Sequence, residues 1–296
     1  MTQAAIFELD HPHTYHLEYK RRTGSDLSSC RHAIHALVAM RTEFPSLVLG
    51  FGFDLWSELA PNSIPRDFRS FDPLESPAGF SAPSTQGDLF IWLHGPLFDP
   101  LFDLALTVQR ILREHFELSH EAHGFVRSES RDLTGFIDGS ANPTGEDARA
   151  AALIPAGSVG ARGSFVLTQK WTHDLDKFGA LDIAAQEQVF GRTKPDSIEF
   201  EGDAMPENSH VGRTDVKVDG VGQKLLRQST PIGTVAEHGL YFLAFSCELS
   251  RFDVLLRRMF GLSEDGIHDR LIEFSEAQTG AYWFAPAEDQ LSEVFG

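Results

Sequence analysis

The stretch "DLFIWLHGPLFDPLFDLALTVQRILREHF", residues 88–116, joins a strand-like segment to a helix-like segment. Residues 88–95 form a short apolar run that ends at a glycine, which is typical of a buried β-strand. From residue 99 onward the apolar side chains recur three and four positions apart, and Pro100 falls in the first turn, where a helix tolerates proline. The stretch therefore predicts a buried strand followed by an amphipathic helix over residues 99–116.

Segments on the N-terminal and C-terminal sides of this stretch complete a βαββαβ order. The alternating residues 13–20 predict a strand, and residues 25–44 predict a helix that has Ser25 or Asp26 as its N-cap and stops before Pro45. The other segments of this half are a strand at 46–53, a loop rich in proline and serine at 61–86, and a short strand at 122–127. This order is that of a split-βαβ, or ferredoxin-like, unit.

The second half of the chain repeats this order less cleanly. Its expected elements are a strand at 163–171, a helix at 181–192, strands near 224–227 and at 239–247, helices at 251–261 and 268–277, and a strand at 281–286. We therefore expect an α+β protein with antiparallel sheets, built from two ferredoxin-like domains, residues 1–145 and 146–296.

Composition and charge exclude several classes of protein. The 296 residues are 42% hydrophobic, which fits a folded chain, and 25 basic against 43 acidic residues give a net charge of −18. Such a surface repels phosphate groups, so nucleic acids and anionic membranes are not expected as partners. Two isolated cysteines, Cys30 and Cys247, make neither a disulfide scaffold nor a zinc–thiolate site. Because the sequence shows no secretory signal and no long apolar run, we expect a cytoplasmic location.

Asp138 lies in the run "GFIDG", residues 135–139, where one acid stands among glycines and apolar residues. An aspartate that precedes a glycine commonly bonds to its own backbone in a turn, and this is the ordinary interpretation. The functional alternative is that the glycines let the backbone pass close to a bulky ligand, while the acid carries a proton near neutral pH. The run alone is compatible with both interpretations.

His210 is one of 13 histidines and lies in the polar segment 206–215. Most histidines in such surroundings lie on the surface or bond to polar neighbours. A neutral imidazole can also be the proximal ligand of haem iron, and its other ring nitrogen then donates to a carboxylate. Asp269 and Glu273, one turn apart in the predicted helix 268–277, are the two candidates for that carboxylate.

Two arginines also have two interpretations each. Arg227 lies in a run of apolar and small residues, where it could reach solvent by its stem or act as a fixed cation that stabilises developing negative charge. Arg192 ends the predicted helix 181–192, where it could interact with the helix dipole or pair with the carboxylate of a ligand. The remaining clusters of histidine and acid match no zinc-site spacing, and the sequence contains no Walker A loop, no GxGxxG and no GxSxG.

Five ordered blocks resemble those of the dye-decolourising peroxidases, most of all the short bacterial, class B-like branch. They are "GFIDG" followed by "NP", "SHVGRTD", "LLRQSTPIGT", "HGLYFLAF" and "TGAYWFAP". The separations agree as well: Asp138 and His210 are 72 residues apart (210 − 138), and His210 and Arg227 are 17 apart (227 − 210). The likeness runs nearly from end to end.

The resemblance implies one b-type haem, held mainly by the C-terminal domain. His210 matches the iron ligand, and Asp138 and Arg227 match the catalytic pair on the opposite face. The other positions expected at the cofactor are Arg192 beside the propionates, Asp269 or Glu273 behind the histidine, Ser229 among the distal hydrogen bonds, and an apolar wall of Phe242, Leu243, Phe245, Met259 and Phe260.

The implied function is a haem peroxidase that reduces hydrogen peroxide and oxidises aromatic or dye-type electron donors through a ferryl intermediate. Asp138 would move a proton between the peroxide oxygens while Arg227 stabilises the charge. The alternative is a haem carrier or an iron-releasing, deferrochelatase-like protein, which needs the iron ligand but not both distal residues. Assembly into dimers or larger homo-oligomers is common in the family.

Large dyes would not enter a buried pocket, so we expect electrons to pass from the dyes to the haem through tryptophan or tyrosine side chains at the surface. Packing in the core is the plainer interpretation of each such side chain. The available side chains are Trp56, Trp92, Trp171, Trp283, Tyr241 and Tyr282.

Overall fold

The computed structural model describes residues 1–8 and 11–296 and combines helices with antiparallel strands, as the sequence predicts. The first half contains η1 (Ala4–Phe7), β1 (His13–Arg21), α1 (Leu27–Met40), β2 (Leu47–Phe51), α2 (Phe53–Leu59), β3 (Leu74–Glu75), β4 (Ser81–Ala82), β5 (Leu89–Gly95), α3 (Phe98–Leu112), β6 (Phe116–Phe125) and η2 (Ser128–Ser130), where η marks a 3-10 helix.

The remainder of the chain begins with α4 (Gly145–Ala152) and β7 (Ser164–His173). It continues with α5 (Leu175–Gly179), α6 (Ile183–Phe190), η3 (Gly202–Ala204), α7 (His210–Thr214), β8 (Lys217–Val218), β9 (Val221–Gly222), β10 (Leu226–Arg227), β11 (Thr230–Gly233), β12 (His238–Ser246), α8 (Leu249–Met259), η4 (Arg270–Glu273), β13 (Ser275–Ala277), β14 (Ala281–Ala285) and α9 (Glu288–Phe295). Within the described ranges, no helix has both the length and the apolar character that a membrane span requires.

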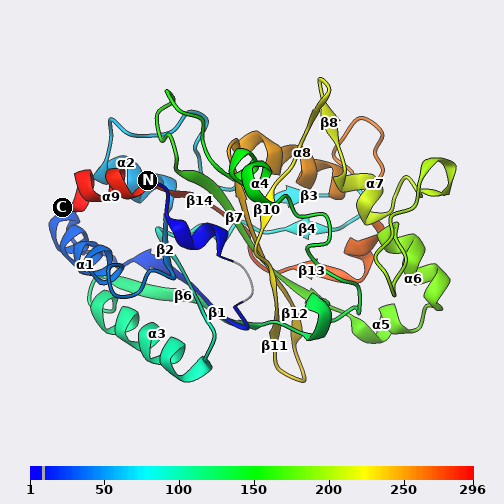
Figure 1. The fold of residues 1–296 in the computed structure, drawn as a ribbon, viewed down its shortest axis with the longest axis horizontal. Helices are drawn as coiled ribbons and strands as arrows, with labels where there is room; N and C mark the ends of the chain where they lie inside the picture. The colour runs from blue at the N-terminus through cyan, green and yellow to red at the C-terminus, as the bar shows by residue number, and fades with distance from the viewer. Residues whose placement is uncertain (9–10) are drawn as a thin grey trace.

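Eight strands follow one another around a closed antiparallel sheet. The first half supplies the order β6-β1-β5-β2, the second half supplies β14-β7-β12-β11, and β11 pairs back with β6. The junctions between the halves are narrow: Phe284 pairs with Phe51 on one side, and Ile232 pairs with Gly124 on the other. Figure 1 shows the strands in the middle, with α1 and α3 at the left and α5, α6 and α7 at the right. The sheet thus has an inner face and an outer, helix-covered face.

Alternate residues of each strand point to the inner and outer faces, because successive side chains of a strand point in opposite directions. On β12, Tyr241, Leu243 and Phe245 pack in the inner cluster with Trp92 and Trp283. The intervening residues of β12 face outward, toward the C-terminal helices, and this alternation decides which side chains can reach a pocket on the outer face.

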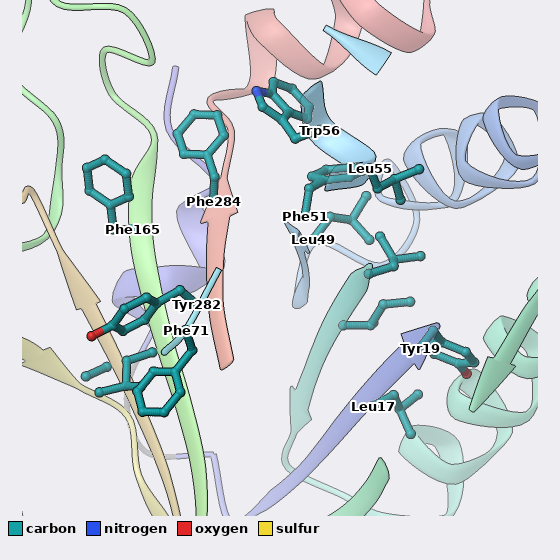
Figure 2. Packing of buried hydrophobic residues seen from close by; sticks show 14 of the residues in the cluster. Leu17, Tyr19, Leu49, Phe51, Leu55, Trp56, Phe71, Phe165, Tyr282 and Phe284 are labelled. Carbon is teal, nitrogen blue, oxygen red and sulfur yellow. The ribbon is translucent and has the colours of Figure 1, made fainter. Parts of the chain in front are cut away.

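Aromatic side chains hold the two halves together outside the ring. In Figure 2, Trp56 of α2 lies beside Phe284 of β14, and their ring centroids are 5.3 Å apart in an edge-to-face arrangement. Phe51 of β2 stacks on Phe295 of α9 at 5.7 Å. All four rings are nearly free of solvent contact, and burial of each stabilises the fold by about 1.5–3 kcal/mol.

The predicted helix at 268–277 is wrong. The chain there forms the short η4 and then β13, which pairs with β7. The apolar spacing of this segment fits a helix, but the side chain of Asp269 caps η4 by accepting from the backbone N–H of Leu271, and residues 275–277 complete the edge of the sheet. Several elements are not predicted from the sequence, among them α2, α4, α7, β11 and α9. Strand β6 begins at Phe116 rather than at residue 122.

Candidate functional site

A pocket opens between the outer face of the C-terminal strands and the segments that cover it. Residues of β7 and β12, of the loop 132–142, and of α7, α8 and η4 line it. It contains about 1670 Å³ free of protein atoms, counting the solvent at its mouth. Its aromatic side chains are Phe136, Trp171, Phe190, Phe242 and Phe252, and leucines such as Leu167, Leu255 and Leu256 complete the apolar wall. An apolar wall with polar groups gathered at a few points is typical of a cofactor or substrate site.

His210 is the first residue of α7, and a buried carboxylate holds its ring. Ser209 caps this helix by accepting from the N–H of Gly212 at 3.1 Å, which places His210 at the pocket. The Nδ1 of His210 lies 2.6 Å from Oδ2 of Asp269, whose side chain is fully buried. The other carboxylate oxygen accepts from the N–H of Leu271 at 2.9 Å. Because a carboxylate can only accept, Nδ1 carries the proton and Nε2 keeps a lone pair for a ligand.

Of the two acids that the sequence leaves open, only Asp269 contacts His210 among the described residues. Glu273 instead lies 2.9 Å from Nε2 of His268, through its Oε1 atom. The 3-10 geometry of η4, in place of the predicted α-helix, turns the two carboxylates toward different partners.

Asp138 lines the same pocket and is held by its own turn. Its N–H donates to the carbonyl of Ser130 at 2.9 Å, and its Oδ1 accepts from the N–H of Gly139 at 2.7 Å. Gly135 and Gly139 have φ values of +91° and +78°, which glycine adopts without strain. The two interpretations of Asp138 are therefore compatible, because the turn places its carboxylate at the pocket.

Arg227 also lines the pocket, and a residue not singled out in the sequence analysis holds its backbone. Asn142 donates from Nδ2 to the carbonyl of Arg227 at 2.7 Å and accepts from its N–H at 2.9 Å. On its other side Arg227 pairs with Ala244 of β12. The only signal in the sequence is the "NP" that follows "GFIDG".

Arg192 lies at the pocket between the loop after Asp138 and a second acid. It donates to Oε1 of Glu199 at 2.7 Å and to the hydroxyl of Ser140. Burial lowers the pKa of Arg192, and the nearby Arg227 lowers it further, while Glu199 and Asp138 oppose these effects. A guanidinium so placed can bind a carboxylate of a ligand.

The other sequence-predicted residues divide between the pocket and the inner face of the sheet. Ser229 and Met259 line the pocket, and the hydroxyl of Ser229 accepts from the N–H of Leu243 at 3.3 Å. The pocket contacts expected of Leu243 and Phe245 are wrong, since both belong to the inner cluster, whereas Phe242 lines the pocket. Phe260 is buried in the outer core and does not line the pocket.

One polar part of the wall was missed by the sequence analysis altogether. His173 lies 2.7 Å from Oγ of Ser275 through Nδ1 and 3.3 Å from Oδ1 of Asp132 through Nε2. Burial alone would raise the pKa of Asp132, but hydrogen bonds from His173 and Thr134 outweigh it and hold this pKa at about 2. The pocket thus keeps a buried carboxylate at a second point of its wall.

The expected electron route through tryptophan or tyrosine stays a prediction, and no such side chain among the described residues lies openly at the surface. All four tryptophans and all four tyrosines of the chain lie in its described part, and none is more than 7% exposed. Among them only Trp171 lines the pocket.

The donor set of the pocket fits a haem. An imidazole whose second nitrogen already donates to a buried carboxylate is the usual ligand of haem iron, and His210 with Asp269 has this arrangement. The apolar wall suits a porphyrin ring, and Arg192 offers a cation for a propionate.

Two family models match most of this chain. The model described as "Dyp-type peroxidase, N-terminal" matches residues 20–126, and "Dyp-type peroxidase, C-terminal" matches residues 129–290. The curated "Dye-decolorizing peroxidase" of Mycobacterium tuberculosis is 35% identical over 254 residues, 84% of this chain and 76% of that protein. The protein of the same name from Rhodococcus erythropolis is 34% identical over 250 residues, 83% of this chain and 73% of its own.

Solved structures agree with this match. The dye-decolorizing protein from V. cholerae superposes with a TM-score of 0.89 at 36% identity and covers 99% of each chain. A variant of DypB from Rhodococcus jostii RHA1 in complex with heme gives a TM-score of 0.92 at 32% identity, again with 99% of each chain covered. The similarity therefore extends over both halves of the chain.

Proposed function

This chain belongs to the Dyp-type peroxidase family, and we propose that its pocket holds haem b with His210 as the iron ligand and with Asp138 and Arg227 as the catalytic pair. The chain is a haem-dependent peroxidase, since the family models and the curated relatives agree on that activity. The observation that carries the proposed site is that one pocket is lined by a carboxylate-supported imidazole together with a free acid and a guanidinium.

The proximal side rests on His210 and Asp269. The carboxylate of Asp269 accepts the Nδ1 proton of His210, which makes Nε2 a stronger electron donor and fixes the orientation of the ring. Arg192 would bind a propionate of the haem. Its guanidinium now donates to Glu199, and it would either give up this hydrogen bond or keep it while also donating to the propionate. When bound, the haem supplies the electrons that cleave the peroxide bond and takes them back singly from the donor.

The distal side rests on Asp138 and Arg227. Asp138 accepts the proton of the entering peroxide and returns it to the oxygen that leaves. The turn at Gly139 holds its carboxylate in place for this transfer. Arg227 stabilises the negative charge that develops on the leaving oxygen. Asn142 and β12 hold the backbone of Arg227, so the side chain that carries the guanidinium extends from a fixed position.

We propose further that the chain consists of two ferredoxin-like domains, residues 1–145 and 146–296. The strand orders β6-β1-β5-β2 and β11-β12-β7-β14 support this, since each places the first strand of its unit between the third and the fourth. The pocket lies on the outer face of the second unit, which agrees with a haem held mainly by that domain.

The comparisons do not favour a haem carrier or an iron-releasing protein. Such a protein needs the iron ligand but has no use for an acid and a guanidinium on the same pocket. The experiment that tests the proposed site is rapid mixing of haem-loaded protein with one equivalent of peroxide, followed through the Soret band, for the wild type, Asp138→Asn and Arg227→Leu.

We expect each distal variant to bind haem normally and to slow the first spectral change by about 100-fold or more. His210→Ala is expected to lose the imidazole-ligated spectrum before peroxide is added. Two distal variants that both react at the wild-type rate would contradict the assignment.

A further inference from the structure

Glu8, His11 and His94 come together outside the haem pocket, where the segment after η1 meets the end of β5. Each offers one ligand atom, and these atoms all lie within 4.8 Å of one another. None of the three lines the pocket described above. We propose that this cluster, the His-His-Glu cluster, binds a divalent transition-metal cation of the zinc type.

The ligand chemistry selects this class of cation. Two imidazoles and one carboxylate form the three-ligand set of many zinc sites, which leave the fourth position to water. Calcium and magnesium prefer sites made of oxygen atoms alone. A net charge of −18 on the chain also raises the local concentration of cations around it.

The spacing of the ligands already approaches that of a bound ion. Oε2 of Glu8 lies 3.4 Å from Nε2 of His11. Two ligands at about 2.0–2.1 Å from a tetrahedral zinc ion lie about 3.4 Å apart, so this pair needs no rearrangement. The rings of His11 and His94 lie against each other, with their centroids 4.3 Å apart and their planes 31° from parallel.

His94 is prepared as a ligand by its surroundings. It is 1% exposed, and its Nε2 lies 3.2 Å from the carbonyl of Ala5, which can only accept a hydrogen bond. The ring proton is therefore on Nε2, and the lone pair is on Nδ1, a buried atom with no hydrogen-bond partner among the described residues. A nitrogen left in this way costs free energy unless water or an ion satisfies it. A histidine that donates one ring N–H to a carbonyl and offers the other nitrogen to a metal is the common arrangement at metal sites.

The cluster lies next to η1, which contacts the segment that carries Arg227. Glu8 directly follows η1, whose residue Ile6 accepts a hydrogen bond from Nε2 of Gln228 at 2.9 Å. Gln228 is the neighbour of Arg227 in the chain. A cation held by Glu8, His11 and His94 would fix the N-terminal segment to β5. It would thereby stabilise the hydrogen bond between Gln228 and Ile6.

Zinc binding to the haem-loaded, full-length chain tests the proposal, because haem occupies His210 and removes it as a competing ligand. The protein carries no affinity tag and is first stripped of metals with a chelator. Zinc is then titrated by calorimetry and counted by elemental analysis, separately from iron. We expect one zinc ion per chain with a Kd of about 10 μM or tighter, and no displacement by a large excess of magnesium.

Two variants and one matched control locate the site. Glu8→Gln and His11→Asn keep size and polarity, and each is expected to weaken zinc binding about tenfold or more. His32→Asn removes an exposed histidine of α1 and should leave binding unchanged. As a second readout, zinc should raise the melting temperature of the wild type and of His32→Asn but not that of the double variant Glu8→Gln/His11→Asn.

Three results would overturn the proposal. They are no zinc binding at about 100 μM, binding that the double variant retains, and displacement of zinc by magnesium. All three are independent of peroxidase activity, so they leave the function proposed for the haem pocket untouched.

Discussion

The side-chain amide of Asn142 pairs with both backbone polar groups of Arg227, at 2.7 Å to the carbonyl and 2.9 Å from the N–H. Arg227 lies on β10, a strand of two residues whose one neighbouring strand within the described part of the chain is β12. The amide therefore takes the place of a second neighbouring strand. It connects the loop that carries Asp138 to the strand that carries Arg227, so the two residues proposed as the catalytic pair are positioned together.

Replacing Asn142 with alanine should loosen Arg227 without touching the guanidinium. We expect Asn142→Ala to leave two backbone groups unpaired, to lower the free energy of unfolding by about 1–3 kcal/mol, and to slow the reaction with peroxide about 10- to 100-fold. Stopped-flow mixing of the haem-loaded protein and urea denaturation measure the two effects. Asn62→Ala removes an exposed asparagine and serves as the control. A normal peroxide rate in Asn142→Ala would show that Arg227 needs no such support.

The two acids near His210 can be separated by a pair of matched substitutions. Asp269→Asn keeps the size of the side chain but removes the charge that accepts the Nδ1 proton of His210, so haem affinity or the peroxide rate should fall about 10- to 100-fold. The reduction potential of the bound haem should rise as the imidazole becomes a weaker electron donor.

Glu273→Gln is the control for this experiment, because Glu273 contacts His268 and not His210. It should leave potential, affinity and rate unchanged. If Glu273→Gln reproduced the effects of Asp269→Asn, the support of His210 would have to be reassigned.

Much of the fold could be predicted from the periodicity of apolar residues, but the face of the sheet to which each side chain of β12 points could not. The strand at 239–247 is visible as an apolar run, and an apolar run on both faces carries no alternation that tells inner from outer residues. The sequence therefore predicts Phe242, Leu243 and Phe245 alike at the pocket, although of the three only Phe242 lines it. The pairing of β12 with β7 decides which of its residues point inward, and the sequence does not show this pairing.

Contacts between distant residues set the second limit. Asn142 and Arg227 are separated by 85 positions, and His173 is 41 positions from Asp132 and 102 from Ser275. No local pattern links such residues, so the pocket wall around His173 gave no signal. His210, Asp138 and Arg227 were found because each lies in a block that resembles a family, and not because their spacing predicts proximity.

Glu18 should make the stability of the fold depend on pH. It is buried inside the ring of strands and accepts hydrogen bonds from Tyr241 at 2.5 Å and Thr168 at 3.0 Å. Burial raises the pKa of Glu18 from 4.5 to about 7, against the lowering effect of these hydrogen bonds. The folded state thus keeps a proton that the unfolded chain releases. The stabilisation is complete below about pH 4.5 and is lost as the pH rises through about 7.

We expect the free energy of unfolding to fall by about 2–3 kcal/mol between pH 5 and pH 8 from this group alone. Glu18→Gln should remove that part of the slope, since a glutamine stays neutral, whereas Glu121→Gln, an exposed acid on β6, should keep it. Urea denaturation at several pH values measures the difference between the variants. Parallel curves for the wild type and Glu18→Gln would mean that the carboxyl is already ionised in the folded state at pH 5.

The burial of every tryptophan and tyrosine should limit which electron donors this peroxidase uses. A donor too large for the pocket needs a redox-active side chain at the surface, and none of the eight reaches it. We expect small phenols, in contrast, to reach the pocket through its mouth and to give up electrons there. We therefore expect kcat/KM for a small phenol to exceed that for an anthraquinone dye by on the order of tenfold or more.

Steady-state kinetics with both donors test this expectation, and Trp171→Phe tests the tryptophan that lines the pocket and could relay electrons into it. If donors react only by entering, Trp171→Phe should leave the ratio of the two kcat/KM values unchanged, as should Trp56→Phe, whose ring lies in the core between the halves. A fall in dye oxidation in Trp171→Phe alone, with phenol oxidation intact, would instead place a relay through that indole.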